Sequence, residues 1–183
     1  LLADSRGFLW LGTQEGLARF DGVQFTLFGP AEGLANASVY DLLEDRAGRY
    51  WIATGGGLYR FTPSPRELLR VSGPGAVDTA VGTTVGASRA AMVLLEDRDG
   101  AIWCGSSQGL LRVRDTGVSG KLVLDEIPLD LDRTEHGGVV GALLEAPDGT
   151  LWIGTGSGLF RRARRECARR PRFGAAGDRR SAG

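Results

Sequence analysis

Few residues of this 183-residue chain belong to types that could carry out acid–base, nucleophilic or metal chemistry. The single histidine, His136, lies in the sequence RTEHGG, where the following glycines predict a loop. One histidine cannot supply a metal site with three histidine ligands. The sequence around it also lacks the amphipathic helical pattern expected of a phosphoacceptor histidine. We therefore expect His136 to be an ordinary loop residue.

Three other features that could carry chemistry have structural interpretations. Cys104 follows a tryptophan at a position where similar segments carry Leu or Ile, which predicts a small buried hydrophobic residue. The sequence GGGL (55–58) lacks the Lys-Ser/Thr of a phosphate-binding loop. The acidic run DLDRTE (130–135) does not fit an EF-hand and predicts a solvated loop. We nominate no catalytic, cofactor-binding or metal-binding residue, and expect a protein that is not an enzyme and has no cofactor.

The four tryptophans mark an internal repeat, because Trp10, Trp51, Trp103 and Trp152 are 41, 52 and 49 residues apart. Each has a glycine three residues before it and a Gly-Leu pair that begins six residues after it. Such self-similarity is the sequence signature of a repeat architecture. The aligned segments are LLADSRGFLWLGTQEGLARF (1–20), LLEDRAGRYWIATGGGLYRF (42–61), LLEDRDGAIWCGSSQGLLRV (94–113) and LLEAPDGTLWIGTGSGLFRR (143–162).

Each repeated position has a structural interpretation. The Asp-x-x-Gly element, as in residues 4–7, predicts a hairpin turn in which the Asp side chain binds local backbone. In the fourth repeat Ala146 replaces the aspartate, and Asp148-Gly149 supplies another turn dipeptide. The tryptophan strand is apolar on both faces, which predicts burial between neighbouring sheets. We expect the tryptophans to pack between repeats rather than to form carbohydrate-binding platforms. The small pair that follows, such as Gly12-Thr13, predicts a close backbone approach.

The pattern around each tryptophan predicts four short strands. In the second repeat these are residues 39–45, 49–54, 58–61 and a weaker outer strand at 68–71, and residues 24–28 and 121–127 are the outer strands of repeats one and three. The 29 glycines fit the many turns that such strands need. The sequence therefore predicts an all-β protein made of β-propeller blades, each a four-stranded antiparallel sheet.

The repeats set the expected domain boundaries. Blade repeat 1 covers residues 1–34 with an incomplete start, repeat 2 covers 35–75, repeat 3 covers 76–133, and repeat 4 covers 134–162 with no outer strand. Residues 72–89, rich in Gly, Ala and Thr, are expected to be a surface loop or an outer strand with long flanks. An open arc of blades leaves both end faces uncovered. The chain is therefore expected to be a piece of a longer propeller or to associate, as in a homodimer.

The zero net charge hides an asymmetry between the repeats and the C-terminal segment. Residues 1–160 carry 13 Lys and Arg against 20 Asp and Glu, whereas residues 161–183 carry nine Arg against two acidic residues. The acidic body argues against nucleic acid as a partner. Three interpretations of residues 163–183 stay open: a basic linker, a patch for nucleic acid or a membrane surface, or a misread C-terminus unrelated to the repeats. Loss of the apolar pattern after residue 162 favours a disordered or non-native end.

Neither hydrophobic runs nor cysteines indicate a compartment directly. The longest apolar runs, AAMVLL (90–95) and VVGALL (139–144), are far shorter than the ~20 residues of a membrane helix. Membrane contact is therefore expected only through segments outside this chain. Two cysteines do not make a disulfide framework, and no signal peptide is present.

The string D-x-x-G-x-[LI]-W-[IL]-G-T-x-x-G-L-x-R-[FY], as in residues 4–20 and nearly so in 45–61, resembles the two-component regulator propeller repeat. The stretch GLANASVYDLLED (33–45) resembles the linker between repeats of that family. The resemblance covers residues 1–162. It implies seven-bladed propellers that form the periplasmic or extracellular sensor region of hybrid histidine kinases and related signalling proteins, many of which respond to polysaccharide-derived ligands.

The resemblance implies a ligand-sensing or interaction module of a two-component signal transduction protein, taking part in phosphorelay through kinase or output domains outside this chain. Its expected partners are an oligosaccharide or other small ligand and those signalling domains. Two alternatives stay open: a structural propeller that binds proteins, and a propeller-scaffold lyase or hydrolase fragment whose catalytic residues lie on other blades.

Recognition has to come from loops at the ends of the blades, since the repeated positions are structural. The residues that differ between repeats lie between the small pair and the Gly-Leu pair. They are Gln14 and Glu15, Gly55 and Gly56, Ser107 and Gln108, and Gly156 and Ser157. The connections at residues 33–38 and 135–138 are further candidates.

Overall fold

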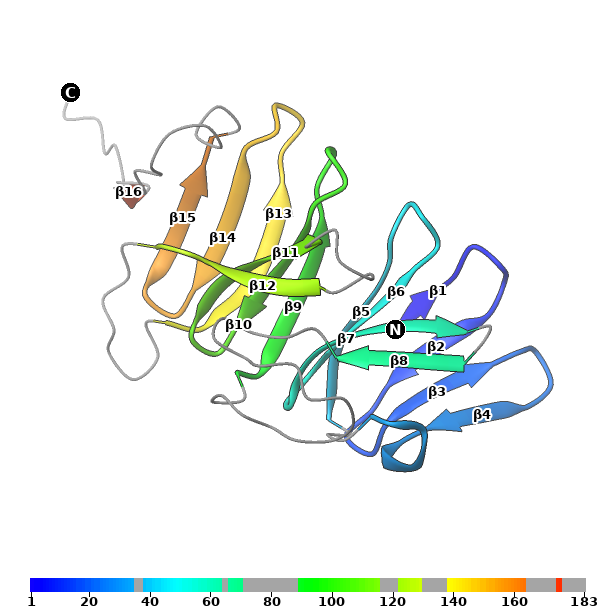
Figure 1. The fold of residues 1–183 in the computed structure, drawn as a ribbon. Helices are drawn as coiled ribbons and strands as arrows, with labels where there is room; N and C mark the ends of the chain where they lie inside the picture. Colours follow the sequence, from blue (N-terminus) through cyan, green and yellow to red (C-terminus); the bar gives the residue numbers. More distant parts are fainter. Residues whose placement is uncertain are drawn as a thin grey trace, which may run out of the picture.

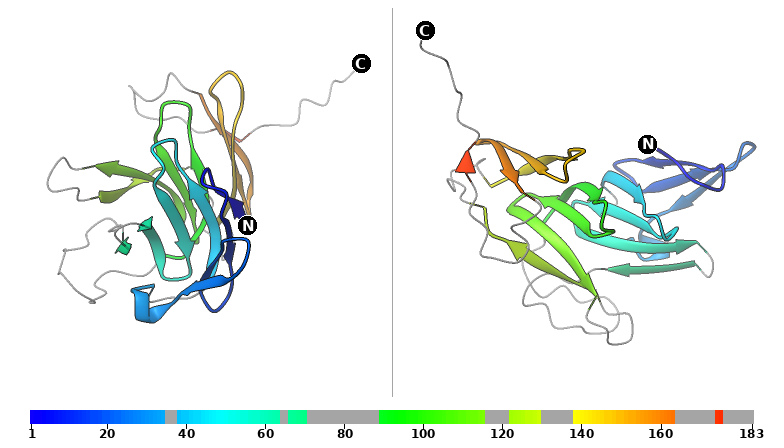
Figure 2. Two further views of the ribbon diagram at one scale, coloured as in Figure 1. Left: turned by 90° about the vertical axis from the view of Figure 1, so that its right-hand side faces the viewer. Right: turned by 90° about the horizontal axis from the view of Figure 1, so that it is seen from above.

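The computed structural model describes residues 1–34, 38–63, 66–70, 89–115, 122–129, 138–163 and 174–175. These residues form four antiparallel sheets that stand side by side in chain order (Figure 1, Figure 2). In each sheet, every strand pairs with the next along the chain. The prediction of an all-β protein made of four-stranded antiparallel units is therefore confirmed.

The strands are short and follow the repeats closely. Sheet 1 contains β1 (Leu2–Ala3), β2 (Leu9–Gly12), β3 (Leu17–Phe20) and β4 (Phe25–Phe28), and the 3-10 helix η1 (Pro30–Glu32) follows it. Sheet 2 contains β5 (Val39–Glu44), β6 (Tyr50–Thr54), β7 (Gly57–Pro63) and β8 (Arg66–Arg70). Sheet 3 contains β9 (Ala91–Glu96), β10 (Ile102–Ser106), β11 (Gly109–Asp115) and β12 (Leu122–Ile127). Sheet 4 contains β13 (Val140–Glu145), β14 (Leu151–Thr155), β15 (Gly158–Arg162) and β16 (Gly174–Ala175).

The last strand differs from the expectation. The sequence predicts no outer strand after residue 162, but β16 pairs with β15 through Phe160–Ala175 and Arg161–Gly174. A two-residue Gly-Ala strand has no alternation of apolar and polar residues, so no sequence pattern announces it. The predicted surface loop at 72–89 lies almost entirely outside the described residues.

The predicted hairpin turns join the first two strands of every sheet. In the first turn, Gly7 has a φ of 86° and donates its backbone N–H to the carbonyl of Asp4 over 3.1 Å. The fourth turn has the same bond, from Gly149 to the carbonyl of Ala146 over 2.9 Å, although the aspartate is missing. In this turn Asp148 supplies the carboxylate, which accepts the backbone N–H of Thr150 over 2.9 Å.

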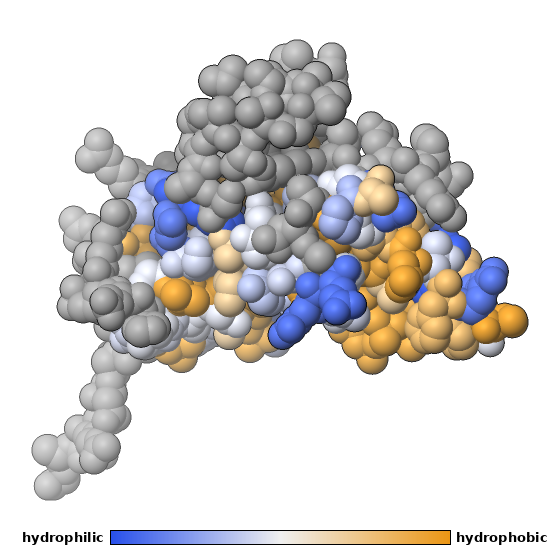
Figure 3. Space-filling model, turned by 90° about the horizontal axis from the view of Figure 1, so that it is seen from below, coloured by the Kyte–Doolittle hydropathy of each residue, from blue (hydrophilic) through white to orange (hydrophobic). Residues whose placement is uncertain are grey.

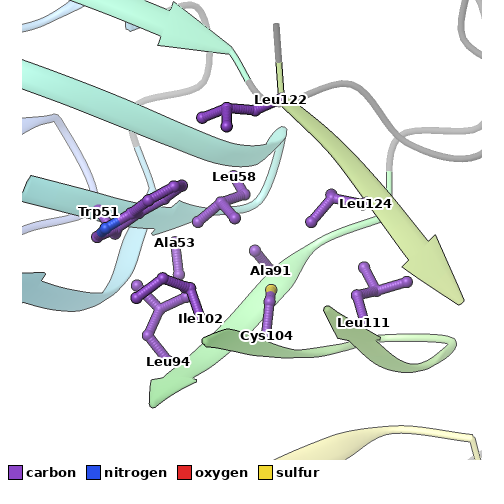
Figure 4. Close-up of a cluster of buried hydrophobic side chains, with 10 residues drawn as sticks. All are labelled: Trp51, Ala53, Leu58, Ala91, Leu94, Ile102, Cys104, Leu111, Leu122 and Leu124. Atoms are coloured by element: carbon purple, nitrogen blue, oxygen red, sulfur yellow. The ribbon is translucent and has the colours of Figure 1, made fainter. Parts of the chain in front are cut away.

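The sheets pack face to face through three apolar clusters, one at each internal interface. Trp10 packs on Tyr50, Ile52 and Phe61 of sheet 2, and it is only 1% exposed. Trp51 packs on Ile102 and other residues of sheet 3, as Figure 4 shows. Trp103 packs on sheet 4 in the same manner. The prediction that these three tryptophans pack between repeats is confirmed.

The small residue after each tryptophan strand allows two sheets to approach closely. A Cβ atom placed on Gly105 would lie 2.6 Å from the carbonyl oxygen of Val140 in sheet 4. One placed on Gly12 would lie 2.6 Å from the Cγ1 atom of Val39 in sheet 2. These distances are too short for real contacts, so the expected close approach is confirmed at both interfaces.

Helices contribute almost nothing to the described part of the chain. The helix η1 is three residues long, and no helix among these residues is long and apolar enough to cross a membrane.

Candidate functional site

The two ends of the sheets differ in what they present to solvent. At one end, the turn between the second and third strands of a sheet lies beside the start of a first strand, either that of the same sheet or that of the next sheet. Gly55 donates its N–H to the carbonyl of Ser38, and Val39 donates its N–H to the carbonyl of Thr13 in the preceding sheet, over 3.0 and 2.8 Å. We call this end the loop end, and the opposite end, which carries the Asp-x-x-Gly turns, the turn end.

A hydroxyl group stabilises each turn at the loop end. The Thr13 Oγ1 donates to the carbonyl of Gly16 over 2.9 Å and accepts the N–H of Glu15 over 3.1 Å. Thr54, Ser106 and Thr155 make the same pair of bonds in the other three sheets. These bonds fix the turn backbone through groups that every repeat carries; in sheet 4 the variable Ser157 adds a side-chain bond to Thr155 over 3.1 Å.

Those variable positions lie at the loop end, as the sequence predicts for a recognition surface. Gln14 and Glu15 are exposed in sheet 1, and Gly156 and Ser157 are exposed in sheet 4. Gly55 and Gly56 in sheet 2 and Ser107 in sheet 3 are half-buried, whereas Gln108 is exposed. A fixed backbone with exposed and differing side chains can present a distinct set of polar groups in each blade.

The connection after sheet 1 is also well ordered at its start. Gly29 donates its N–H to the Glu32 carboxylate over 2.7 Å, and Leu34 is fully buried in the cluster around Trp10. Of the two connections that the sequence nominates, residues 35–37 and 135–137 lie outside the described residues, and His136 lies there with them.

Tyr40 is an exposed aromatic residue at the loop end that the sequence patterns did not single out. It lies at the start of β5, where the pairing with β6 shifts between Val39 and Asp41, and it is 53% exposed. Corresponding irregularities in β9 and β13 place Met92 and Gly141 at the same point. Bulges often re-aim a side chain beside a functional site. Only the pairing register reveals this position, because a bulge has no sequence pattern of its own here.

The turn end contains a buried hydrogen-bond network rather than an open site. The Asp4 carboxylate accepts the indole N–H of Trp10 over 2.7 Å and the hydroxyl of Tyr50 over 2.6 Å. Asp45 and Asp97 accept the indole N–H of Trp51 and Trp103 in the same way. Each of these carboxylates also accepts two backbone N–H groups of its own turn.

These hydrogen bonds decide the protonation of the turn carboxylates. Burial opposes ionisation of Asp4, but the bonds from Tyr50, Trp10, Phe8 and Arg6 together outweigh it and lower the pKa of that carboxyl. Burial and the bond to Asp4 raise the pKa of the Tyr50 hydroxyl. In Asp45 burial again opposes ionisation, and the bonds from Trp51 and Arg49 lower the pKa. Near neutral pH, Asp4 and Asp45 are therefore ionised and the Tyr50 hydroxyl is protonated, which suits a structural role.

A second set of bonds at the turn end links neighbouring sheets, and we call these bonds the clamps. The N–H of Ser5 donates to the Glu44 carboxylate over 2.7 Å, and that of Arg46 donates to Glu96 over 3.0 Å. In the third clamp, Arg98 donates both its backbone N–H and its side-chain Nε to Glu145, over 2.8 and 2.7 Å. In each clamp, the residue after a turn aspartate thus donates its backbone N–H to the glutamate that ends the first strand of the next sheet.

The remaining predicted features are structural or lie outside the described residues. Cys104 is fully buried, and burial raises the pKa of its thiol to about 12, so it behaves as the small hydrophobic residue that the sequence predicts. The acidic run at 130–135 lies outside the described residues. Within them, no group of three or more His, Cys, Asp or Glu side chains could hold a metal ion.

Comparison with protein families gives one match. The family described as two component regulator propeller matches residues 33–56 and 135–157. These ranges include the first two strands of sheets 2 and 4, and they end in the variable turns at the loop end. The predicted resemblance to this repeat family is confirmed. No curated protein sequence matches the chain.

Solved structures share the fold. The extracellular domain of BT4673 from B. thetaiotaomicron, described as a hybrid two component system, has a TM-score of 0.71 at 21% identity over 95% of this chain. The extracellular domain of BT3049 from the same organism has a TM-score of 0.66 at 17% identity over 97%. An inactive variant of virginiamycin B lyase from Staphylococcus aureus, crystallised with quinupristin, has a TM-score of 0.64 at 15% identity over 99%.

These structures are much longer than the chain. The chain spans 21% of each of the two extracellular domains and 55% of the lyase. At these identities the similarity establishes the propeller fold, and the fold is shared by extracellular domains of two component systems and by an enzyme.

Proposed function

We propose that this chain is part of a ligand-sensing β-propeller in the periplasmic or extracellular region of a two-component signalling protein. The observation that carries the proposal is the match of two repeats to the two component regulator propeller family. The similarity to extracellular domains of hybrid two component systems supports the same assignment. The repeats are proposed to be the blade units at 1–34, 35–75, 76–133 and 134–162, within a seven-bladed propeller whose kinase or output domain lies outside this chain.

The loop end is the proposed recognition surface. Its turns are fixed by hydroxyl–backbone bonds, so the exposed Gln14, Glu15 and Gln108 side chains are displayed on a rigid support. Tyr40 adds an exposed aromatic ring at the same end of the sheets. Aromatic faces and polar side chains together suit a sugar, whose rings stack on aromatic groups while its hydroxyls form hydrogen bonds. An oligosaccharide is therefore the ligand class that we propose.

An enzymatic function has less support from this chain. The lyase shares the fold at 15% identity, and such similarity carries no information about activity. The described residues contain no histidine, and the thiol of Cys104 is buried. A propeller that binds only proteins stays an alternative, because the same exposed loops could contact a partner surface.

The test is a thermal-shift screen of the protein against a panel of oligosaccharides, followed by calorimetric titration of any hit. A stabilising glycan is expected, and Tyr40→Ala should weaken its binding by about tenfold, consistent with losing roughly 1–2 kcal/mol of aromatic contact. Phe25→Ala, which removes a similarly exposed aromatic ring on the outer strand β4, is the matched control and should bind normally.

Two results would contradict the proposal. If no glycan binds but a protein partner is retained through the loop end, the propeller is an interaction module. If Tyr40→Ala and Phe25→Ala weaken glycan binding equally, the loop end is not the recognition surface. Reading the complete gene provides an independent check, since the proposal requires a signalling output domain in the same protein.

A further inference from the structure

The first strands of sheets 2, 3 and 4 share an irregularity that turns one residue of each out of the interfaces between sheets. In β5, Val39 packs in the cluster shared with sheet 1, whereas the Asp41 carboxylate accepts the N–H of Leu94 in sheet 3 over 2.8 Å. In a regular strand these two residues would point to the same side, because side chains alternate with a period of two. The shift in pairing between them therefore leaves Tyr40 facing neither neighbouring sheet. Its side chain is 53% exposed although sheet 2 is covered on both faces.

The same shift occurs in β9 and β13. In β9, Ala91 belongs to the cluster shared with sheet 2, and Val93 packs on the cluster shared with sheet 4. Met92 lies between them, is half-buried and joins none of the three apolar clusters that the described residues form. In β13 the residue at this position is Gly141. Three sheets thus present Tyr, Met and Gly at one equivalent point.

Neither the backbone nor the packing requires a glycine at position 141. Its φ lies outside the left-handed region, and a Cβ atom placed on it would have no neighbour within 4 Å in the described part of the chain. The shift does not need glycine either, since Tyr40 and Met92 form it in β5 and β9. The open face of sheet 4 is not the cause of this space, because Ala142 and Leu144 lie on that face and adjacent residues of a strand point to opposite sides. Glycine within a strand often marks a point that a ligand approaches closely.

The three positions lie in one row on the same side of the molecule, at the loop end. The strand β9 lies between β5 and β13 and contacts both, whereas the outer strands β8 and β12 stand apart (Figure 1, Figure 2). The sheets therefore converge on their first strands, and in a closed propeller this side lines the central channel. The bond between Asp41 and Leu94 joins β5 to β9 beside the shifts, which holds Tyr40 and Met92 at a fixed spacing. Figure 3 views the molecule from the loop end, where polar and apolar residues are both exposed.

We propose that Tyr40, Met92 and Gly141 form the floor of the glycan site and select for the length of the ligand, an inference that rests on the proposed function. The Tyr40 ring and the Met92 thioether offer apolar surface to the face of a sugar ring. A further sugar unit of the same chain lies over Gly141, where the missing side chain leaves room for it. Because the floor extends over three first strands and its side chains carry no charge, the ligand is a neutral oligosaccharide rather than a single sugar or an acidic glycan.

The test is calorimetric titration of the full 183-residue chain with neutral cello-, malto- and xylo-oligosaccharides, from single sugars to hexasaccharides. Affinity is expected to rise with length. Gly141→Leu should weaken binding of the hexasaccharide by about tenfold and that of the disaccharide much less, because the added side chain fills space that only a longer ligand needs. Met92→Ala should weaken binding of both by about fivefold, through loss of apolar contact.

Two controls separate an effect on binding from an effect on the fold. Circular dichroism and the urea midpoint of Gly141→Leu should match those of the unchanged protein, because neither φ nor neighbouring atoms resist a side chain there. Ala47→Leu introduces the same side chain at an exposed residue of the turn end and should bind every oligosaccharide normally.

The outcomes separate this inference from the proposed function. If glycans bind and Tyr40→Ala weakens them while Met92→Ala and Gly141→Leu do not, recognition lies on the turns of the loop end. The row is then not the floor of the site, and the proposed function stands. An equal effect of Gly141→Leu on ligands of every length would overturn selection by length, and tighter binding of acidic oligogalacturonides than of any neutral series would overturn the ligand class. If no glycan binds, both the inference and the proposed function are wrong.

Discussion

At the scale of single residues, the aspartate of each repeat does more than form a turn. Asp4 accepts backbone N–H groups within its turn, the indole N–H of Trp10 and the hydroxyl of Tyr50 from the next sheet. One carboxylate therefore orients the tryptophan that fills the interface and also bonds to the sheet that receives it. Because the group is buried, loss of its acceptor capacity leaves several donors without a partner.

Asp4→Asn is expected to lower the free energy of unfolding at pH 7 by roughly 2 kcal/mol, because an amide NH2 cannot accept the bonds that the second carboxylate oxygen accepts. The pKa of Asp4 is lowered in the folded protein. Its contribution is therefore fully present above the unfolded pKa, about 3.9, and is lost as the pH falls from there through the lower folded pKa. Urea unfolding of both proteins between pH 7 and pH 3 should show the difference shrinking below about pH 4.

Glu15→Gln, at an exposed residue of the turn between β2 and β3, is the control for that experiment. It should have little effect on the free energy of unfolding. Equal destabilisation by the two substitutions, or a difference that does not change with pH, would contradict the role assigned to Asp4.

Sequence reasoning predicts the turn role of these aspartates but not their bonds to tryptophan. The Asp-x-x-Gly spacing predicts the turn, because the atoms that form it lie only a few bonds apart along the chain. The indole bond depends on how β2 runs back past the turn and on the rotamer of Trp10, neither of which follows from spacing.

At the scale of elements, the distance between sheets is set by the small residues at the end of the tryptophan strands. Gly105→Ala should destabilise the protein by about 1–3 kcal/mol, because the added methyl group would overlap Val140 of sheet 4 and Val93. Gly154→Ala is the matched substitution in sheet 4, where the nearest atom is the Ala142 Cβ at 3.1 Å. It should cost clearly less, as measured by the urea midpoint of each variant. Equal costs would show that strand propensity, and not sheet spacing, decides the effect.

The strands themselves follow from sequence more completely than their contacts do. The predicted strands at 39–45, 49–54 and 58–61 correspond to β5, β6 and β7, since alternation and turn residues are local signals. The bulge at Tyr40 and the short strand β16 could not be predicted from the sequence. Each depends on pairing with a neighbouring strand, and that pairing has no pattern in the residues of the bulge or of β16 themselves. The clamps also join residues far apart in the chain, so they appear only when the sheets are placed side by side.

At the scale of the whole molecule, the repeated positions predict the fold but do not indicate what the protein recognises. Positions that recur in every repeat, such as Trp10 and Gly105, face a neighbouring sheet and serve the architecture. The sequence could nominate the variable turns by exclusion, and the structure places Gln14 and Glu15 at an exposed end with fixed backbone. Their chemistry still depends on which loops meet across a closed propeller, and that is a property of the assembly rather than of one repeat.

The stability of the four sheets should therefore be uneven in a single copy. Sheets 2 and 3 are covered on both faces, whereas sheets 1 and 4 are covered on one, and repeat arrays gain much of their stability from interfaces between neighbours. In this chain, amide hydrogen exchange should be slowest in β6 and β10 and faster in β2 and β14. The exposed amides of the turn at Gln14 serve as the internal reference and should exchange quickly. Uniform protection of all four sheets would mean that each sheet is stable by itself, and it would contradict the role assigned here to the interfaces between sheets.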